Sequence, residues 1–139
     1  MAVTERMTEA QTLQLEGEAC SGLGEGAGFT ALEWVRREFL AKLGFEPYPG
    51  TFNLRMNGPE WEAARRVMAQ ESGIPITPEA GFCAARCFHV VIAGSITGAV
   101  VFPEVAGYPS DKFEVISAVP VRQALGLADG DRVAVSVVC

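Results

Sequence analysis

Polar and apolar residues alternate near the start of the chain, and the apolar period then becomes helical. Residues 12–17 alternate strictly, which predicts a first strand. After a glycine-rich segment, the apolar spacing changes to that of one helical face. Thr30 and Glu33 have the spacing of a capping box, and Gly44 is a typical helix terminator. The apolar residues of this predicted helix are Leu32, Val35, Phe39 and Leu43.

A second helix is predicted in the middle of the chain, and short apolar runs typical of strands follow it. Residues 59–70 begin with a proline, which is favoured at the first helical position. Their spacing places Trp61, Ala64 and either Val67 or Met68 inward. The other predicted elements are strands at 88–93, 98–102, 112–116 and 132–137 and a short helix at 120–125 that ends at Gly126.

Short strands therefore dominate, and we expect a mainly β fold. A small closed barrel accommodates many short strands without long exposed edges. The chain has 139 residues, 49% of them hydrophobic, which is enough for one domain with a real core. Residues 1–11 are polar and are predicted to be a disordered tail, so residues 12–139 form the single predicted domain.

Charge and hydropathy narrow the class of protein. The formal net charge is −6, which argues against nucleic acid or an anionic membrane as a partner. No apolar run approaches the roughly 18 residues of a membrane span, and no apolar signal core follows the N-terminus. We therefore expect a cytoplasmic protein.

The four cysteines are too few for a disulfide scaffold, and reduced thiols are expected. On a strand that begins near residue 82, Cys83, Cys87 and the single histidine, His89, would share one face. Three zinc ligands are one interpretation, although no second cysteine pair is present. The preferred interpretation is small buried cysteines beside a hydrogen-bonded histidine.

Two neutral oxygen side chains, Thr51 and Asn53, lie two residues apart after Pro49 and Gly50. In a strand they project to the same side. Two such oxygens hold Mg²⁺ only weakly, so the pair fits an ion that arrives with a nucleotide and takes its other ligands from phosphates and water. The alternative is a Pro-Gly turn that enters a strand with two polar residues facing solvent.

The glycine-rich segment, residues 21–28, joins the first strand to the first helix. This arrangement is formally compatible with a dinucleotide-binding fingerprint, but the repeated βαβ units of that fold are not predicted here. A P-loop is excluded because no Gly-Lys-Ser/Thr follows. Glycines nevertheless let backbone N–H groups approach an anion closely, so a nucleotide loop and a loop without a ligand both remain open.

Several motifs in order resemble the archaeal-type CTP-dependent riboflavin kinases, over roughly residues 15–137. The most specific are SGLGEG at 21–26, LGFEPY at 43–48 and GTFNL at 50–54. The resemblance continues in VVFP at 100–103, FEVI at 113–116 and Arg122, and it ends with a weak match, LGLADGD at 125–131.

The resemblance implies a six-stranded cradle-loop-type barrel with two or three short inserted helices. It also implies transfer of the terminal phosphate of CTP to riboflavin, giving FMN and CDP, with Mg²⁺ as cofactor. By matching position, Thr51 and Asn53 would bind the metal, and Glu114 and Ala106 would lie at the flavin. The implied nucleotide-binding residues are Gly22, Leu23, Gly24, Glu25, Gly26, Ala27, Val119, Pro120, Val121 and Arg122.

The chain departs from the family's kinase pattern at three positions. Ala27 stands where that pattern has a basic residue, Pro120 replaces a lysine, and Ala106 replaces a threonine near the flavin. The alternative function is therefore a non-catalytic flavin- or nucleotide-binding barrel related to these kinases. No residue pair indicates a general base, and Arg86 is expected to be an ion-paired surface residue rather than a substitute phosphate ligand.

Overall fold

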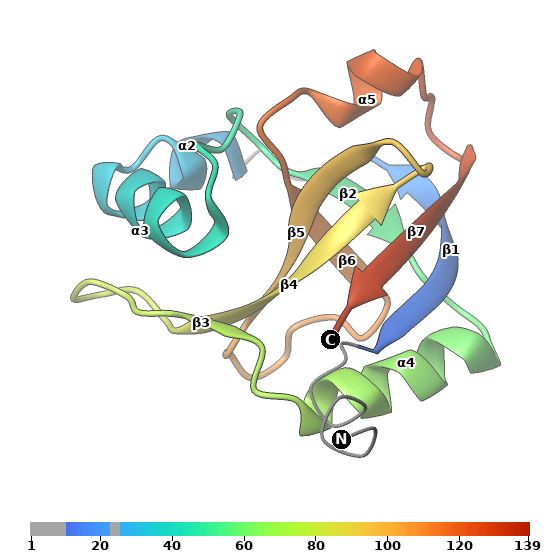
Figure 1. Ribbon diagram of the computed structural model, residues 1–139, viewed down its shortest axis with the longest axis horizontal. Coiled ribbons are helices and arrows are strands. Elements are labelled where there is room, and N and C mark those ends of the chain that lie inside the picture. The colour runs from blue at the N-terminus through green and yellow to red at the C-terminus, as the bar shows by residue number, and fades with distance from the viewer. Residues whose placement is uncertain (1–10, 23–25) are drawn as a thin grey trace, which may run out of the picture.

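The computed structural model describes residues 11–22 and 26–139, and its main element is a closed antiparallel barrel (Figure 1). The six barrel strands neighbour one another in the order β4-β5-β6-β2-β1-β7, and β7 pairs back onto β4. The predicted six-stranded barrel is confirmed. The barrel strands are β1 (Thr12–Cys20), β2 (Phe52–Arg55), β4 (Ala85–Ile92), β5 (Ile96–Pro103), β6 (Lys112–Ile116) and β7 (Arg132–Val138).

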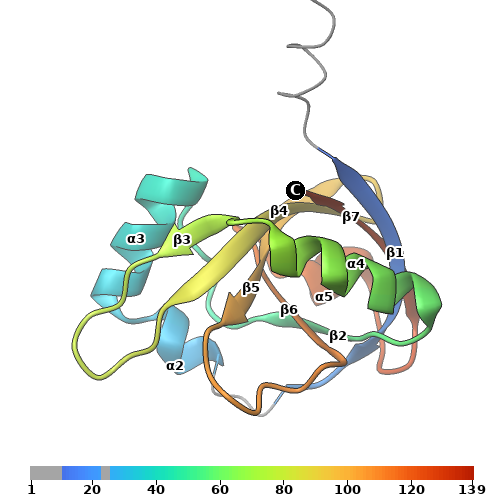
Figure 2. The ribbon, with the colours of Figure 1, turned by 90° about the horizontal axis from the view of Figure 1, so that it is seen from below.

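A short additional strand and four helices complete the described part of the chain. Strand β3 (Ile74–Ile76) extends the sheet beyond β4. The helices are α2 (Gly26–Thr30), α3 (Glu33–Leu43), α4 (Pro59–Gln70) and α5 (Val121–Leu125). Figures 1 and 2 show α4 and α5 at opposite ends of the barrel and α2 and α3 beside it.

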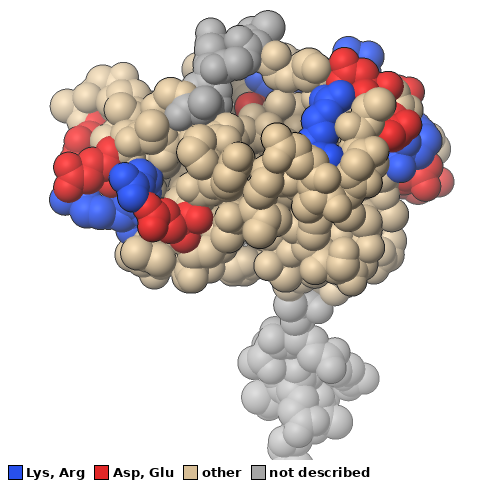
Figure 3. All heavy atoms as spheres, turned by 90° about the horizontal axis from the view of Figure 1, so that it is seen from above, with Lys and Arg blue, Asp and Glu red and all other residues tan. Residues whose placement is uncertain are grey.

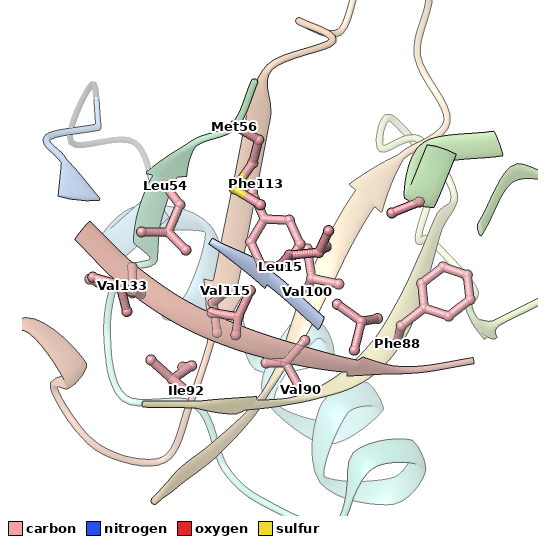
Figure 4. Packing of buried hydrophobic residues seen from close by; sticks show 14 of the residues in the cluster. Leu15, Leu54, Met56, Phe88, Val90, Ile92, Val100, Phe113, Val115 and Val133 are labelled. Atoms are coloured by element: carbon pink, nitrogen blue, oxygen red, sulfur yellow. The ribbon is translucent and has the colours of Figure 1, made fainter. Parts of the chain in front are cut away.

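Alternation along each strand directs one set of apolar side chains into the barrel (Figure 4). Leu15, Leu54, Val100 and Phe113 point toward one another there, each at most 8% exposed. Trp61 of α4 belongs to the same cluster, so this helix covers one end of the barrel. The interior is therefore filled by side chains and leaves ligand sites to the outer surface and the loops.

Helix α3 packs against the outer face of β4 and β5. Its Val35 and Phe39 are fully buried in a second cluster with Cys87 and Val101. These two strands are thus buried on both faces, which is why their sequences contain nearly continuous apolar runs.

The first predicted helix is divided in the structure. Thr30 ends α2 rather than capping α3, and its Oγ1 accepts a hydrogen bond from the Gly50 N–H at 2.9 Å. Leu32 is the N-cap of α3 and provides no side-chain hydrogen bond, so the predicted capping box is wrong. The predicted terminator is confirmed, because Gly44 has φ 85° and its N–H donates to the Leu40 carbonyl.

Helix α4 spans the predicted residues, with Pro59 in its first turn and Met68 buried. Arg86 donates two hydrogen bonds to its last turn, at 2.9 Å to the Met68 carbonyl and 2.8 Å to the Glu71 carbonyl. Arg86 therefore satisfies carbonyls at the end of a helix, as helix C-termini require.

The zinc interpretation is wrong for the described residues. Cys87 is buried, whereas Cys83 and His89 are exposed. The part of the chain that the structure describes contains no group of three His, Cys, Asp or Glu residues able to hold a metal. The expectation of buried cysteines holds for Cys87 alone, because Cys83 lies in the loop before β4.

Three further observations concern the N-terminal tail, membrane-spanning helices and the charges on the surface. Residues 1–10 of the predicted tail lie outside the described residues, while Gln11 exchanges two backbone hydrogen bonds with Cys139. Within residues 11–22 and 26–139, no helix is long and apolar enough to cross a membrane. On the face seen in Figure 3, groups of both charge signs lie at the two sides, with uncharged surface between them.

Candidate functional site

The predicted metal ligands lie together at the start of β2. The Thr51 hydroxyl donates to Asn53 Oδ1 at 3.2 Å, and the Asn53 amide donates to the Thr51 carbonyl at 3.4 Å. Asn53 is only 7% exposed. The prediction that both side chains project to one side is confirmed, and their oxygens are close enough to share one small cation. The solvent-facing alternative is wrong for Asn53, because the start of the glycine-rich segment lies against it.

Gly22 lies directly against the Asn53 side chain, where there is no room for a Cβ. A Cβ at this position would lie 2.6 Å from Asn53 Nδ2, closer than real contacts allow. Strand pairing brings the two together, because Cys20 is opposite Asn53 in the β1–β2 register. The first residue of the predicted nucleotide loop therefore lies directly against a predicted metal ligand.

One row of residues on the outer surface of the barrel connects the residues predicted to bind the metal with the residue predicted to bind the flavin. Asn53 pairs with Glu114 across β2 and β6, and Glu114 pairs with Val101 across β6 and β5. Directly opposed residues of antiparallel strands share a face. Glu114 is therefore next to the Thr51–Asn53 pair.

Asp129 joins the two segments predicted to bind the nucleotide. The Ser21 hydroxyl lies 3.1 Å from both of its carboxylate oxygens, and Arg122 Nη2 lies 2.5 Å from Oδ1. Arg122 Nε also donates to the Leu127 carbonyl at 3.2 Å. The Arg122 and Ser21 donors hold the pKa of Asp129 below its ordinary value.

Sequence reasoning assigned no role to Ser21 or Asp129. The only signal for Asp129 was the Asp-Gly-Asp turn at 129–131, a motif that many small barrels share. In this turn the Asp131 carboxylate accepts a hydrogen bond from the Ala128 N–H at 2.8 Å, and the Gly130 N–H donates to the Ala19 carbonyl at 2.8 Å. These bonds fix the turn to the end of β1, immediately before the glycine-rich segment.

A cavity of about 200 Å³ opens between the entrance to β2 and the start of α5. Thr51 and Ser117 line one side, and residues 119–122 line the other. Val119 is 42% exposed, whereas Val121 is 3% exposed and packs in the barrel core. Of the four residues predicted here, Val121 can therefore contact a ligand only through its backbone.

A second cavity, of about 320 Å³, lies over the outer face of β5 and β6. Its volume is at the lower end of the range for small-molecule sites, and its walls are mainly apolar. Thr51 lines this cavity as well as the first one. The apolar lining residues include Phe29, Phe82, Val101 and Ile116, and the polar ones include Thr51, Lys112 and Glu114.

Glu114 is held by two neighbours. The Tyr108 hydroxyl donates to Glu114 Oε1 at 2.6 Å, and Lys112 Nζ lies 3.5 Å from the same oxygen. The Lys112 ammonium also lies 5.4 Å from the centre of the Tyr108 ring. Burial and the adjacent carboxylate raise the pKa of Tyr108, so the phenol remains a hydrogen-bond donor at all ordinary pH values.

The remaining predicted site residues are placed less directly. Leu23, Gly24 and Glu25 lie outside the described residues, and Gly26 and Ala27 begin helix α2. Ala106 is exposed in the loop that joins β5 to β6, and it does not line the 320 Å³ cavity.

Comparisons with known proteins show the family of this chain. A family model named CTP-dep_RFKase, described as "Domain of unknown function DUF120", matches residues 19–137. The chain is 44% identical over 131 residues to a riboflavin kinase of Archaeoglobus fulgidus, covering 91% of this chain and 55% of that protein. It is 39% identical over 127 residues to a riboflavin kinase of Methanosarcina barkeri, covering 88% and 56% respectively. The chain thus spans little more than half the length of these relatives.

Proposed function

Because the chain belongs to the CTP-dependent riboflavin kinase family, we propose that it transfers the terminal phosphate of CTP to a ribityl hydroxyl of riboflavin. The products are FMN and CDP. The observation that carries the proposal is the position of Thr51, which lines both the 200 Å³ and the 320 Å³ cavities and contacts Asn53. Donor and acceptor can therefore meet at the same pair of oxygens.

The larger cavity suits the flavin. Its apolar walls, which include Phe29, Phe82 and Ile116, match a flat aromatic ring system. Glu114 supplies an acceptor for flavin hydrogen-bond donors, and Tyr108 and Lys112 keep its carboxylate in place. A hydrogen bond to a charged group of this kind contributes about 1.5–3 kcal/mol.

The smaller cavity suits the nucleotide. Arg122 offers a planar fork for phosphate or for the cytosine edge, and backbone groups of residues 119–121 line the same space. Gly22, Gly24 and Gly26 have no Cβ, which favours close approach of a phosphate to the backbone of this segment. CTP as the donor rests on the family and not on a contact that distinguishes cytosine.

The donor set at Thr51 and Asn53 fits Mg²⁺. Both have neutral side-chain oxygens, and these lie within hydrogen-bond distance of each other. Mg²⁺ held by Thr51 and Asn53 would keep several waters and would take further ligands from the triphosphate. When bound, Mg²⁺ neutralises charge on the transferred phosphoryl group.

This chain's own residues then act mainly by positioning. Glu114 orients the flavin, Thr51 and Asn53 mark the point of transfer, and Asp129 keeps Arg122 against the nucleotide cavity. Phosphoryl transfer depends largely on alignment and charge neutralisation, so the site requires no dedicated general base.

One observation favours the alternative of a binding barrel without chemistry. Arg122 is already paired with Asp129, so its charge is shared before any phosphate arrives. Ala27 and Pro120 remove two further cations relative to the family's pattern. A triphosphate would then depend on the metal and on backbone N–H groups for most of its neutralisation.

The direct test is phosphorylation of riboflavin with CTP, ATP, GTP and UTP in Mg²⁺, with FMN measured by chromatography and flavin fluorescence recorded in the same samples. FMN formed with CTP supports the kinase. Fluorescence quenching without FMN supports the binding barrel. The absence of both signals would contradict both functions.

A double variant tests the point of transfer. Thr51→Ala with Asn53→Ala is expected to abolish Mg²⁺-dependent nucleotide binding and FMN formation while the fold is retained. The matched control is Asn57→Ala with Thr97→Ala, since both side chains are exposed and neither residue lines the two cavities. Unchanged Mg²⁺-dependent binding in the first double variant would remove these two residues from the metal site.

A further inference from the structure

A third cavity, of about 300 Å³, is lined by residues of α4 and of the loop that joins β5 to β6. Figure 2 shows where this helix and this loop lie. The third cavity is separate from the two cavities assigned above, although Lys112 lines both this one and the flavin cavity. Its charge is opposite to that of the chain. Four of the eleven Lys and Arg residues line it, but only one of the seventeen Asp and Glu residues does so.

The four cations differ in the hydrogen bonds and ion pairs that they already form. Arg86 is committed to carbonyls at the end of α4, and Arg65 pairs with Glu62 at 3.0 Å. Arg66 is exposed and forms no ion pair with any residue in the described ranges. Arg66 and the 35% exposed Lys112 side chain are therefore the cations best placed to bind an added anion.

The floor of the cavity is apolar and rigid. Trp61 Nε1 donates to the Ser110 carbonyl at 2.9 Å, and the indole packs edge-on against Phe113 at 5.8 Å. Met68 and Phe102 extend this floor. A flat apolar body can lie there while an anionic group reaches the cations at the rim.

We propose that this cavity is a second binding site, for an aromatic phosphate or a similar organic anion with a flat apolar body. Charge-assisted hydrogen bonds from Arg66 and Lys112 hold the anionic group, and the half-buried Phe102 contacts the apolar part, with the 2% exposed Trp61 in the same cavity wall. The two parts of the ligand are both required, because the cations are largely solvated and bind a free ion weakly.

The cavity is coupled to the flavin position, a consequence that rests on the proposed function. Tyr108 and Lys112 form its wall and also hold Glu114. An anion that draws Lys112 toward the third cavity removes the cation nearest to Glu114. Flavin affinity therefore changes when the cavity is filled, and by linkage the flavin changes the affinity for the anion equally.

Tryptophan fluorescence can report on this cavity alone. The chain has two tryptophans, and Trp34→Phe leaves Trp61 as the only one. This change suits the protein because Trp34 Nε1 is buried and has no hydrogen-bond partner among the described residues. The probes are phenyl phosphate, inorganic phosphate and the uncharged benzyl alcohol, each titrated against the Trp34→Phe protein.

The expected result is a saturable change in Trp61 emission with phenyl phosphate and far weaker binding of the other two probes. Arg66→Glu should weaken phenyl phosphate binding at least tenfold, and Arg66→Met should weaken it less. The control Arg37→Glu reverses an exposed charge on α3 and should leave the affinity unchanged. No saturable change, equal affinity in Arg66→Glu, or equally tight binding of inorganic phosphate would overturn the proposal.

The coupling is measured separately, as the riboflavin dissociation constant with and without saturating phenyl phosphate. A change of threefold or more supports it, and an unchanged value overturns the coupling. If the proposed function fails and riboflavin does not bind, the Trp61 titration still decides whether the anion site exists.

Discussion

Gly22→Ala tests whether the close approach between the glycine-rich segment and the metal position is needed for function. The added Cβ would lie 2.6 Å from Asn53 Nδ2, and ordinary contact begins near 3.4 Å. The two atoms must therefore separate by about 0.8 Å, in a site where Asn53 is 7% exposed. Gly22 has no left-handed φ, so the effect is steric and not a matter of backbone conformation.

The size of the effect follows from this displacement. Overpacking of a closely packed site costs about 1–3 kcal/mol of unfolding free energy. Misplacing a reacting group by about 1 Å costs up to about 10²-fold in rate. We expect kcat/KM for FMN formation to fall by about 30- to 100-fold, with a higher Mg²⁺ requirement because the proposed metal ligand Asn53 is displaced.

Gly28→Ala is the matched control. A Cβ at Gly28 meets nothing within 4 Å, and the residue lies in helix α2. Alanine is favoured over glycine in a helix by up to about 1 kcal/mol, so this variant should be equally or more stable and keep its kcat/KM within about twofold. Both variants are compared by steady-state kinetics across Mg²⁺ concentrations and by urea unfolding. Gly22→Ala with the kinetics of the control would refute the reasoning.

Three further predictions concern stability and thiol chemistry. Gly98→Ala should lower the unfolding free energy by about 1–3 kcal/mol in urea, because its Cβ would lie 2.5 Å from the Ile116 carbonyl oxygen; a change under about 0.5 kcal/mol would contradict this. Because the folded pKa of Asp129 is lowered, its stabilising effect is present above the usual aspartate pKa of about 3.9 and is lost as pH falls through the folded value. The melting temperature of Asp129→Asn should therefore differ from that of the wild type near neutral pH and converge with it in strong acid; parallel curves would argue against the pairing. Iodoacetamide at pH 8 should label exposed Cys83 first, and riboflavin should slow that labelling because Cys83 lines the proposed flavin cavity. Buried Cys87, with its pKa raised to about 12, should react only after unfolding; a different order of labelling in mass spectrometry would contradict this prediction.

Elements whose signals are local were predicted well from the amino-acid sequence. Helix α4 has a proline in its first turn and an apolar face with a helical period, and both are visible within residues 59–70. Gly44 and Gly126 end α3 and α5 with left-handed backbone conformations that glycine adopts without strain. The spacing of Thr51 and Asn53 likewise placed their side chains on one side of the chain.

Features that depend on barrel closure were not predictable in this way. Ser21 and Asp129 are 108 residues apart, and they meet only because β7 pairs with β1 and returns the 129–131 turn to the end of that strand. Thr30 has the sequence of a helix cap, yet its hydroxyl accepts the Gly50 N–H of the β2 entrance. Short-range spacing specifies turns, helix ends and strand faces, because those bonds form between near neighbours in the chain. Other features arise from contacts between distant strands, which exist only once the barrel has closed. They are the contacts of Asp129 with Ser21 and Arg122, the two cavities that Thr51 lines, and the burial of Asn53 against Gly22.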